Sequence, residues 1–294
     1  MSETTSKARI GFVGLGIMGQ HMAGHLLAGG HPLRVYNRSR DKAQRLVEQG
    51  AVWCDTPGEV ARGCDVVITM VGYPKDVEQV WLGADGILPH ASRALLIDMT
   101  TSSPALAQRL AEEAEQRGCR ALDAPVSGGD VGAREARLSI MVGGDAEAFE
   151  EALPILRLMG TNIVHTGSAG AGQHTKMCNQ IVIGSTIMGV CEGLAYAREA
   201  GLDQNIVLQS IGGGAAGSFQ LNVLGPRIVK GDFAPGFMIE HFLKDLSIAL
   251  DEAERLKLDL PGAAQARKLY TQLAGKGHGR EGTQALYKLY GARA

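Results

Sequence analysis

The chain has little net charge and no long apolar run. Its 294 residues include 29 Lys and Arg against 31 Asp and Glu, a formal net charge of -2. Binding nucleic acid by neutralising phosphates requires an excess of basic side chains, so this function class is not expected. No apolar run approaches the ~20 residues of a membrane helix, and residues 1–9 hold no apolar signal core. We therefore expect a soluble cytoplasmic protein with no membrane or nucleic-acid partner.

Motifs of disulfide frameworks, metal sites and serine hydrolases are also missing. The five cysteines form no CxxC pair, so we expect reduced, mostly buried thiols, as in the cytosol. His21 and His25 share a helical face in HMAGH, but the glutamate of an HExxH zinc site is absent, and no metal is expected. No serine lies in a GxSxG elbow, so nothing indicates a hydrolase.

Glycine, in contrast, is abundant. The chain has 40 glycines, about twice the usual share of ~7%. They show no collagen period and cluster at a few places, where the backbone must turn sharply or approach a ligand closely.

The first half alternates short apolar strands with helical patterns. Helices are predicted over Ile17–Ala28 and Arg40–Glu48, each closed by glycine. Alternation with short glycine turns predicts an α/β fold with a doubly wound, Rossmann-type parallel sheet. The predicted strands are Arg9–Val13, Leu33–Tyr36, Asp65–Val71, Leu95–Asp98, Ala121–Asp123, Ser139–Val142 and Ile163–His165.

The second half has helical patterns only. Gln173–Ala200 contains no proline and predicts a helix roughly 40 Å long, with further helices at 205–211, 217–230, 238–256 and 261–275. We therefore predict two domains meeting at a cleft: residues 1–168, which bind NADP, and residues 169–294, all-helical, for substrate binding and oligomerisation. The apolar surround of the long helix favours a homodimer or homotetramer.

A GxGxxG sequence follows the first strand and opens the first helix. In Gly14, Leu15, Gly16, Ile17, Met18 and Gly19, the first glycine permits a tight turn and the second lets the backbone reach a pyrophosphate. The third permits close packing of helix on strand. This context predicts a dinucleotide site.

The end of the second strand bears on the choice of dinucleotide. NAD-specific proteins place an acidic residue there for the ribose 2′-hydroxyl, but this chain has Asn37, Arg38 and Ser39. Arg38 can pair with a 2′-phosphate, and its neighbours can donate hydrogen bonds. NADP is favoured and NAD stays possible, since a missing acid weakens NAD preference without abolishing it.

Five collinear motifs from about residue 9 to the end resemble the β-hydroxyacid dehydrogenase family. They are GFVGLGIMG, IDMTT, DAPVSGG, GAGQHTKMCNQ and HFLKDLSIAL. That family includes 3-hydroxyisobutyrate dehydrogenase, tartronate semialdehyde reductase and, more distantly, 6-phosphogluconate dehydrogenase. The resemblance is specific for the family and much less so for the substrate.

The resemblance implies a catalytic role for Lys176. Oxidising a hydroxyl by hydride transfer needs a base for the O–H proton, and a desolvated lysine with a lowered pKa can serve near neutrality. Ser127, Gly128 and Gly129 form a run of small residues suited to a backbone nest for the substrate carboxylate.

The remaining site residues also follow from the resemblance. Asn179, Gln180 and Asp245 are expected to contact or orient the substrate, with Gln180 replacing the family's usual second asparagine. Cofactor contacts are expected from Met70, Val71, Thr101 and Lys244 in addition to the glycine loop and residues 37–39.

The sequence thus predicts an NAD(P)-dependent oxidoreductase that interconverts a small β-hydroxyacid and its semialdehyde. Three alternatives stay open. A 6-phosphogluconate-type decarboxylase would need a longer helical domain, and an imine reductase usually has another residue at the lysine position. A dinucleotide-binding scaffold without activity would be expected to have lost Lys176.

Overall fold

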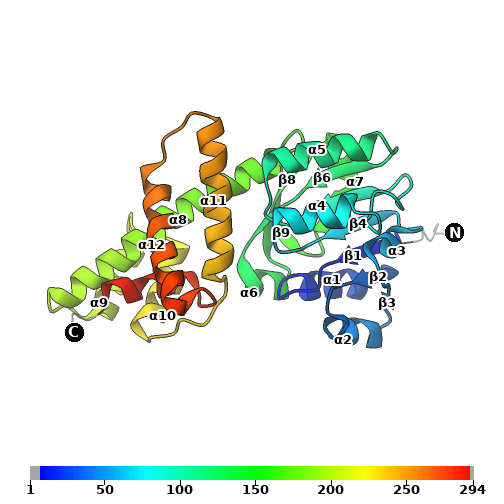
Figure 1. Cartoon of the computed structure of the whole chain (residues 1–294). Helices are drawn as coiled ribbons and strands as arrows, with labels where there is room; N and C mark the ends of the chain where they lie inside the picture. Colours follow the sequence, from blue (N-terminus) through cyan, green and yellow to red (C-terminus); the bar gives the residue numbers. More distant parts are fainter. Residues whose placement is uncertain (1–6, 292–294) are drawn as a thin grey trace. The chain divides into compact units, whose positions relative to one another are not determined.

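The computed structural model describes residues 7–291, which fall into two compact units (Figure 1). One unit extends to Lys176 and the other begins at Met177. The first holds a mostly parallel sheet with helices and the second is helical, so the predicted fold class is confirmed. The predicted domain limits, 1–168 and 169–294, stay a prediction.

The described part of unit 1 contains a nine-stranded sheet in the order β3-β2-β1-β4-β5-β6-β8-β7, with β9 beside β8. The strands from β3 to β6 are parallel, whereas β8 is antiparallel to β6 and β7. The order reverses at β1, and ligands bind at such a switch point. The strands are β1 Ile10–Val13, β2 Leu33–Tyr36, β3 Val52–Trp53, β4 Val66–Thr69, β5 Leu95–Asp98, β6 Arg120–Asp123, β7 Val126–Ser127, β8 Leu138–Gly144 and β9 Gly160–Gly167.

Helices cover both faces of this sheet. Ile68 of β4 packs into one hydrophobic core with α1 and α7, while its neighbour Val67 packs into a second core with α3, α4 and α5. Strands buried on both faces are apolar throughout, which explains the continuous apolar runs in the sequence. The helices are α1 Gly19–Ala28, α2 Gln44–Glu48, α3 Pro57–Ala61, α4 Pro74–Leu82, α5 Pro104–Glu115, α6 Gly129–Arg134 and α7 Ala146–Leu156.

Some elements of unit 1 differ from the sequence-based expectation. Residues 40–48 form a 3₁₀ turn, Arg40–Ala43, before the short α2. The strands β3 and β7 were not predicted, because each has only two residues and so carries no periodicity. The first helix begins at Gly19 rather than at Ile17.

Unit 2 is built around α8, Ala171–Glu199, which begins in unit 1. Its core includes Ile187 and Cys191 of α8, Phe242 of α11 and Tyr270 of α12. Phe242 and Tyr270 meet edge to face, with ring centroids 5.1 Å apart. The further elements are α9 Gln204–Gly212, a π-helical turn Gln220–Leu224, α10 Gly225–Val229, α11 Ile239–Arg255, α12 Pro261–Leu273, a π-helical turn Ala274–His278 and a 3₁₀ segment Thr283–Tyr290.

The helix predicted over 217–230 is present as a continuous helical run over 219–229. Its first part is a π-helical turn, Gln220–Leu224, which leads directly into the short α10, a change of helix type that the sequence pattern did not indicate. The 3₁₀ segment 283–290 was not predicted.

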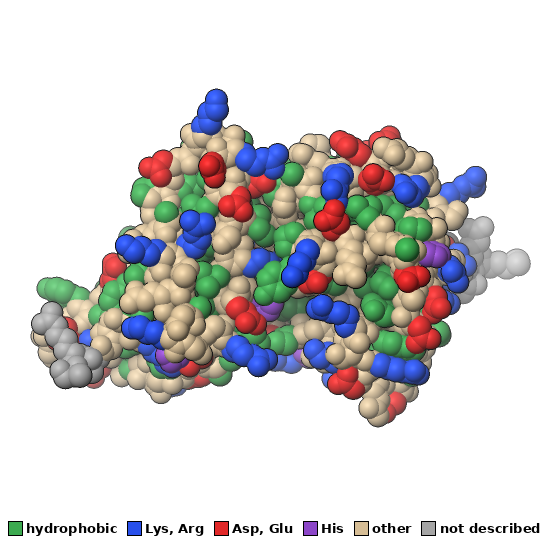
Figure 2. Space-filling view, viewed as in Figure 1, with side chains coloured by type: hydrophobic (Ala, Val, Ile, Leu, Met, Phe, Trp, Pro, Cys, Tyr) green, Lys and Arg blue, Asp and Glu red, His purple; other side chains and the backbone are tan. Residues whose placement is uncertain are grey.

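By length and composition alone, α8 could cross a membrane; its most apolar 18-residue window has a mean hydropathy of 1.3. The core helix of a soluble protein passes the same test, and α8 supplies core residues to unit 2. Figure 2 shows acidic and basic side chains interspersed over the visible face. A soluble protein is consistent with these observations, and a cytoplasmic location stays a prediction.

Buried polar groups lie where β4 and β5 end. Thr69 Oγ1 donates a hydrogen bond to Asp98 Oδ1 at 2.7 Å, and the Trp81 indole donates to Thr69 Oγ1 at 3.1 Å. The Thr100 N–H also donates to Asp98 Oδ1, at 3.1 Å. Burial raises the pKa of Asp98 to about 6, against the opposing effect of these hydrogen bonds. Folding therefore disfavours the ionised form of Asp98.

Replacing Asp98 by asparagine should change the pH dependence of stability. An asparagine whose amide oxygen occupies the Oδ1 position keeps both hydrogen bonds. Because the folded pKa of Asp98 lies above its ordinary value of 3.8, its contribution to stability is fully present below about pH 4 and is lost as pH rises through about 6. Relative to wild type, the free energy of unfolding of Asp98→Asn should rise by about 2 kcal/mol from pH 4 to pH 7 in urea unfolding.

Asp65→Asn is the matched control. Hydrogen bonds from Arg9 lower the pKa of Asp65, so its contribution is present at neutral pH and is lost as pH falls through that lowered pKa. This variant should show the opposite and smaller pH trend, since the pair is exposed. Parallel stability curves for wild type and Asp98→Asn would contradict the prediction.

Candidate active site

The glycine loop between β1 and α1 has two closely packed glycines and one open glycine. A Cβ on Gly14, whose φ is +101°, would lie 2.2 Å from the Met70 carbonyl oxygen. A Cβ on Gly19 would lie 1.9 Å from the Gly14 carbonyl oxygen, whereas one on Gly16 would meet nothing within 4 Å. The loop thus packs tightly at its two ends and leaves its middle accessible.

The segment after β2 is bonded to this loop. Asn37 Oδ1 accepts a hydrogen bond from the Leu15 N–H at 2.9 Å, and Asn37 Nδ2 donates to the Ser39 carbonyl at 3.0 Å. The Arg38 side chain is 81% exposed, and its guanidinium lies 3.6 Å from a carboxylate oxygen of Asp76, in the first turn of α4. Asp76 is an acidic neighbour that the sequence did not reveal.

The loops after β4 and β5 are joined by hydrogen bonds. The Val71 N–H donates to Thr100 Oγ1 at 2.9 Å. The buried Gln173 side chain accepts from the Ser102 N–H at 2.9 Å and donates to the Thr100 carbonyl at 2.8 Å. These bonds fix the backbone on both sides of Thr101. Unit 1 therefore collects the predicted cofactor residues of its four central strands at one edge of the sheet.

Asp123 ends β6 beside Asp98 of β5, since the two residues are partners in the strand register. Its carboxylate accepts hydrogen bonds from the N–H groups of Gly170 and Gln173, both at 2.8 Å. Burial raises the pKa of Asp123 to about 6, and the backbone hydrogen bonds oppose this shift.

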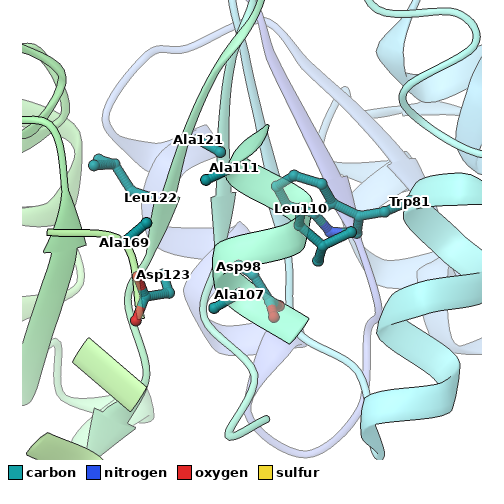
Figure 3. A pocket seen from close by; sticks show the side chains of 9 residues that line it. All are labelled: Trp81, Asp98, Ala107, Leu110, Ala111, Ala121, Leu122, Asp123 and Ala169. Carbon is teal, nitrogen blue, oxygen red and sulfur yellow. The ribbon is translucent and has the colours of Figure 1, made fainter. Parts of the chain in front are cut away.

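A cavity of about 10 Å³ lies beside the two carboxylates and is also lined by Trp81, Leu110 and Ala169. Figure 3 shows Asp98 and Asp123 at its edge. Such a volume holds about one water molecule, so this cavity is not a substrate site.

Lys176 lies against the segment predicted to bind the substrate carboxylate. The Lys176 side chain is buried, and its Nζ donates a hydrogen bond to the Val126 carbonyl at 2.8 Å. The next three residues are Ser127, Gly128 and Gly129, and both glycines have positive φ, +131° and +63°. Unit 1 therefore brings together the predicted proton-transfer residue and the predicted nest.

The predicted residues of unit 2 form a second polar group. Asn179 Nδ2 donates to Gln180 Oε1 at 2.7 Å, and Gln180 Nε2 donates to Asp245 Oδ2 at 2.6 Å. Lys244 Nζ lies 3.1 Å from the other oxygen of Asp245. Gln180 and Asp245 are both buried, so the longer side chain at position 180 serves to reach α11.

Sequence reasoning assigned no role to three buried residues of unit 1. They are Asp98, Gln173 and Asp123, whose carboxylate binds the N–H groups at the start of α8. An acidic residue at the end of two consecutive predicted strands was the available signal, because ends of neighbouring parallel strands meet at one edge. Nothing in the sequence distinguished Gln173. Among residues 7–291, no group of three or more His, Cys, Asp or Glu side chains could hold a metal.

Two family models match consecutive parts of the chain. Residues 9–167 match the NAD binding domain of 6-phosphogluconate dehydrogenase. Residues 170–290 match a model described as the NAD-binding part of NADP-dependent 3-hydroxyisobutyrate dehydrogenase.

Individual relatives are similar over nearly the whole chain. An uncharacterised oxidoreductase of Bacillus subtilis is 53% identical, covering 97% of this chain and 99% of the relative. The 2-hydroxy-3-oxopropionate reductase of Escherichia coli is 41% identical, covering 92% of each chain. The solved structure of Mycobacterium tuberculosis 3-hydroxyisobutyrate dehydrogenase with L-serine has a TM-score of 0.90 at 31% identity, covering 97% and 100%.

These similarities confirm the predicted enzyme class, an oxidoreductase, and the predicted cofactor class, NAD(P). A small-molecule substrate is consistent with them, whereas the roles of individual site residues stay predictions. The similarity spans both family models and nearly every residue of the relatives. The chain therefore belongs to the β-hydroxyacid dehydrogenase family.

Proposed function

We propose that this enzyme interconverts a small 3-hydroxyacid and its semialdehyde, with Lys176 as general acid and base and NADP as the preferred cofactor. The observation that carries the proposal is the buried Lys176 Nζ, 2.8 Å from the Val126 carbonyl and directly before the Ser127–Gly129 segment. A lysine held beside a carboxylate nest can reach a hydroxyl two carbons away from that carboxylate.

The relatives' names suggest the substrate class. The molecules named there, 2-hydroxy-3-oxopropionate, 3-hydroxyisobutyrate and L-serine, share a carboxylate at C1, an oxygen at C3 and a small group at C2. In our proposal the backbone N–H groups at Gly128 and Gly129 and the Ser127 hydroxyl bind the carboxylate. The C3 oxygen then faces Lys176.

Lys176 handles the proton of the reaction. In the oxidation direction its neutral amine takes the proton of the C3 hydroxyl while the C3 hydrogen leaves as hydride, and a C=O bond forms. In the reverse direction the ammonium returns that proton to the oxygen. The Val126 carbonyl orients Nζ through its hydrogen bond. Positioned proton transfer of this kind contributes about 10²–10⁴-fold in rate.

The cofactor, when bound, accepts or supplies the hydride. The glycine loop fits its pyrophosphate, because Gly16 leaves open space where a side chain would otherwise stand. Leu15, Ile17 and Met18 complete the loop, while Met70, Val71 and Thr101 border it from the next strands. The residues Asn37, Arg38 and Ser39 would bind the adenosine ribose.

The NADP preference rests on Arg38. Its guanidinium is exposed at the end of β2 and can pair with a 2′-phosphate. Asp76 opposes this preference, but the two groups are 3.6 Å apart and the Arg38 side chain is 81% exposed, so solvent weakens the ion pair to about 0–1 kcal/mol. A doubly charged phosphate therefore competes successfully for the guanidinium.

The polar group of unit 2 belongs to the same proposal. Asn179, Gln180 and Asp245 would contact or orient the substrate, and Lys244 would contact the cofactor. We also propose a homodimer or homotetramer. Exposed apolar side chains of unit 2, including Val182, Tyr196 and Ile206, support this assembly.

Gly16→Ala should weaken cofactor binding without unfolding the protein. The added methyl group meets no protein atom but occupies the space assigned to the pyrophosphate, so the Kd for NADPH should rise at least about tenfold, or about 1.4 kcal/mol. Gly14→Ala should lower the free energy of unfolding by more than about 2 kcal/mol, because of its positive φ and the Met70 contact. Fluorescence titration and urea unfolding measure the two effects.

Gly24→Ala, in α1, serves as the control. Its Cβ would meet ordinary contacts only, so this variant should bind NADPH normally and gain up to about 1 kcal/mol of stability. Normal NADPH binding by Gly16→Ala would remove the glycine loop from the cofactor site.

Arg38→Asp should shift cofactor preference from NADP towards NAD. The guanidinium is lost and a carboxylate able to bind a 2′-hydroxyl is gained, so the ratio of the two Kd values should change by about 10²-fold. Asp76→Asn should tighten NADPH binding about threefold, since it removes the competing charge. Arg62→Asp is the control, because it makes the same charge change just before β4, at the opposite ends of the strands from the proposed site. It should alter neither Kd. An unchanged ratio of the two Kd values in Arg38→Asp would refute the 2′-phosphate assignment.

Lys176→Ala should strongly reduce turnover and leave cofactor binding intact. With 3-hydroxyisobutyrate, 3-hydroxypropionate, glycerate, 4-hydroxybutyrate and their aldehydes as the substrate panel, kcat should fall about 10²–10⁴-fold. Lys176→Arg should also fail, because a guanidinium does not give up its proton. The exposed Lys268→Ala is the control; a wild-type kcat in Lys176→Ala would exclude the lysine mechanism.

A further inference from the structure

The carboxylate of Asp123 closes the start of α8, the helix that carries Lys176. Asp123 Oδ1 accepts from the Gly170 N–H and Oδ2 from the Gln173 N–H, each at 2.8 Å. Both oxygens therefore hold backbone amides that lack carbonyl partners at a helix N-terminus. A negative charge is also favourable at this end of a helix dipole.

The start of α8 packs closely against the backbone around this carboxylate. A Cβ on Gly143 of β8 would lie 2.5 Å from Asp123 Oδ1 and 2.6 Å from the Gly172 nitrogen. A Cβ on Gly172 would lie 2.6 Å from the Asp123 carbonyl oxygen. The backbone of the helix start thus rests directly on the ends of β6 and β8.

Lys176 lies in the first turns of α8, three residues after the Gln173 N–H that Asp123 binds. Gln173, whose N–H is held by Asp123, uses its side chain to bind the backbone of Thr100 and Ser102. Lys176 lies three residues further on and so projects from a neighbouring position on the helix. Its Nζ reaches the Val126 carbonyl, three residues after Asp123 itself.

We propose that Asp123 is the positioning residue for Lys176. By fixing the first turn of α8 on the end of β6, it sets the place at which Nζ meets the Val126 carbonyl and the Ser127–Gly129 segment. This inference rests on the proposed role of Lys176. A misplacement of about 1 Å in such a group costs about 10²-fold in rate, so the clamp controls the proton-transfer step rather than cofactor affinity.

Asp123→Asn tests the proposal at pH 8, where Asp123 is ionised in the wild type because its pKa is about 6. The amide turns one acceptor into a donor that faces a backbone N–H. We expect kcat to fall about 30- to 100-fold, with the Kd for NADPH unchanged within twofold. Asp145→Asn is the matched control, since Asp145 caps α7, which carries no proposed site residue. It should retain wild-type kcat.

A double-mutant cycle separates positioning from general damage. In the Lys176→Ala background, Asp123→Asn should lower the residual rate less than threefold, because the group it positions is gone. An equal loss in both backgrounds would overturn the proposal. Full activity in Lys176→Ala would refute the proposed function. Full activity in Asp123→Asn, together with a strong loss in Lys176→Ala, would refute only the positioning role of Asp123.

Hydrogen exchange provides a readout that needs no substrate. In Asp123→Asn the amides of residues 170–176 should exchange at least tenfold faster than in wild type, while those of the glycine loop keep their protection. Unchanged exchange at 170–176 would overturn the proposal. If Asp123→Asn does not accumulate as folded protein, Asp123→Ser, which keeps one acceptor and removes the charge, replaces it in every measurement.

Discussion

The site of unit 1 depends on a helix N-terminus held by the buried carboxylate of Asp123. An unpartnered buried carboxylate is strongly disfavoured, but each oxygen of Asp123 receives a backbone N–H. The same two bonds satisfy amides that the start of α8 would otherwise leave without partners. These two hydrogen bonds thus satisfy both the buried carboxylate and the backbone N–H groups at the helix start. They also attach α8, which carries Lys176, to the end of β6.

The parallel sheet explains why so many functional residues meet at this edge. β1, β2, β4, β5 and β6 all end there, and each is followed by residues assigned to the cofactor, the substrate or the clamp. Apolar packing on both faces fixes the strands, so the loops that follow them begin at determined places. The polar bonds among Thr69, Asp98 and Thr100 then link neighbouring strand ends.

The sequence was informative where a pattern was long or chemically distinctive. Gly14–Gly19 and the alternation of strands and helices predicted the Rossmann fold, and the long α8 was expected within two residues of its limits. Two-residue strands such as β3 carry no period, and the apolar pattern of 217–230 does not show that its first part is π-helical. Partners such as Gln173 and Thr100 are 73 residues apart, a pairing that no local pattern encodes.

Gln180 illustrates how the site tolerates a departure from the family pattern. An asparagine there would be one methylene shorter, whereas the glutamine amide spans from Asn179 to Asp245 on α11. Asp245 is buried, so its carboxylate needs both this donor and the nearby Lys244 ammonium. The substitution therefore preserves an amide in the polar group and adds a tie between two helices of unit 2. Gln180 keeps the amide group of the family's asparagine, and its longer side chain reaches Asp245 on α11.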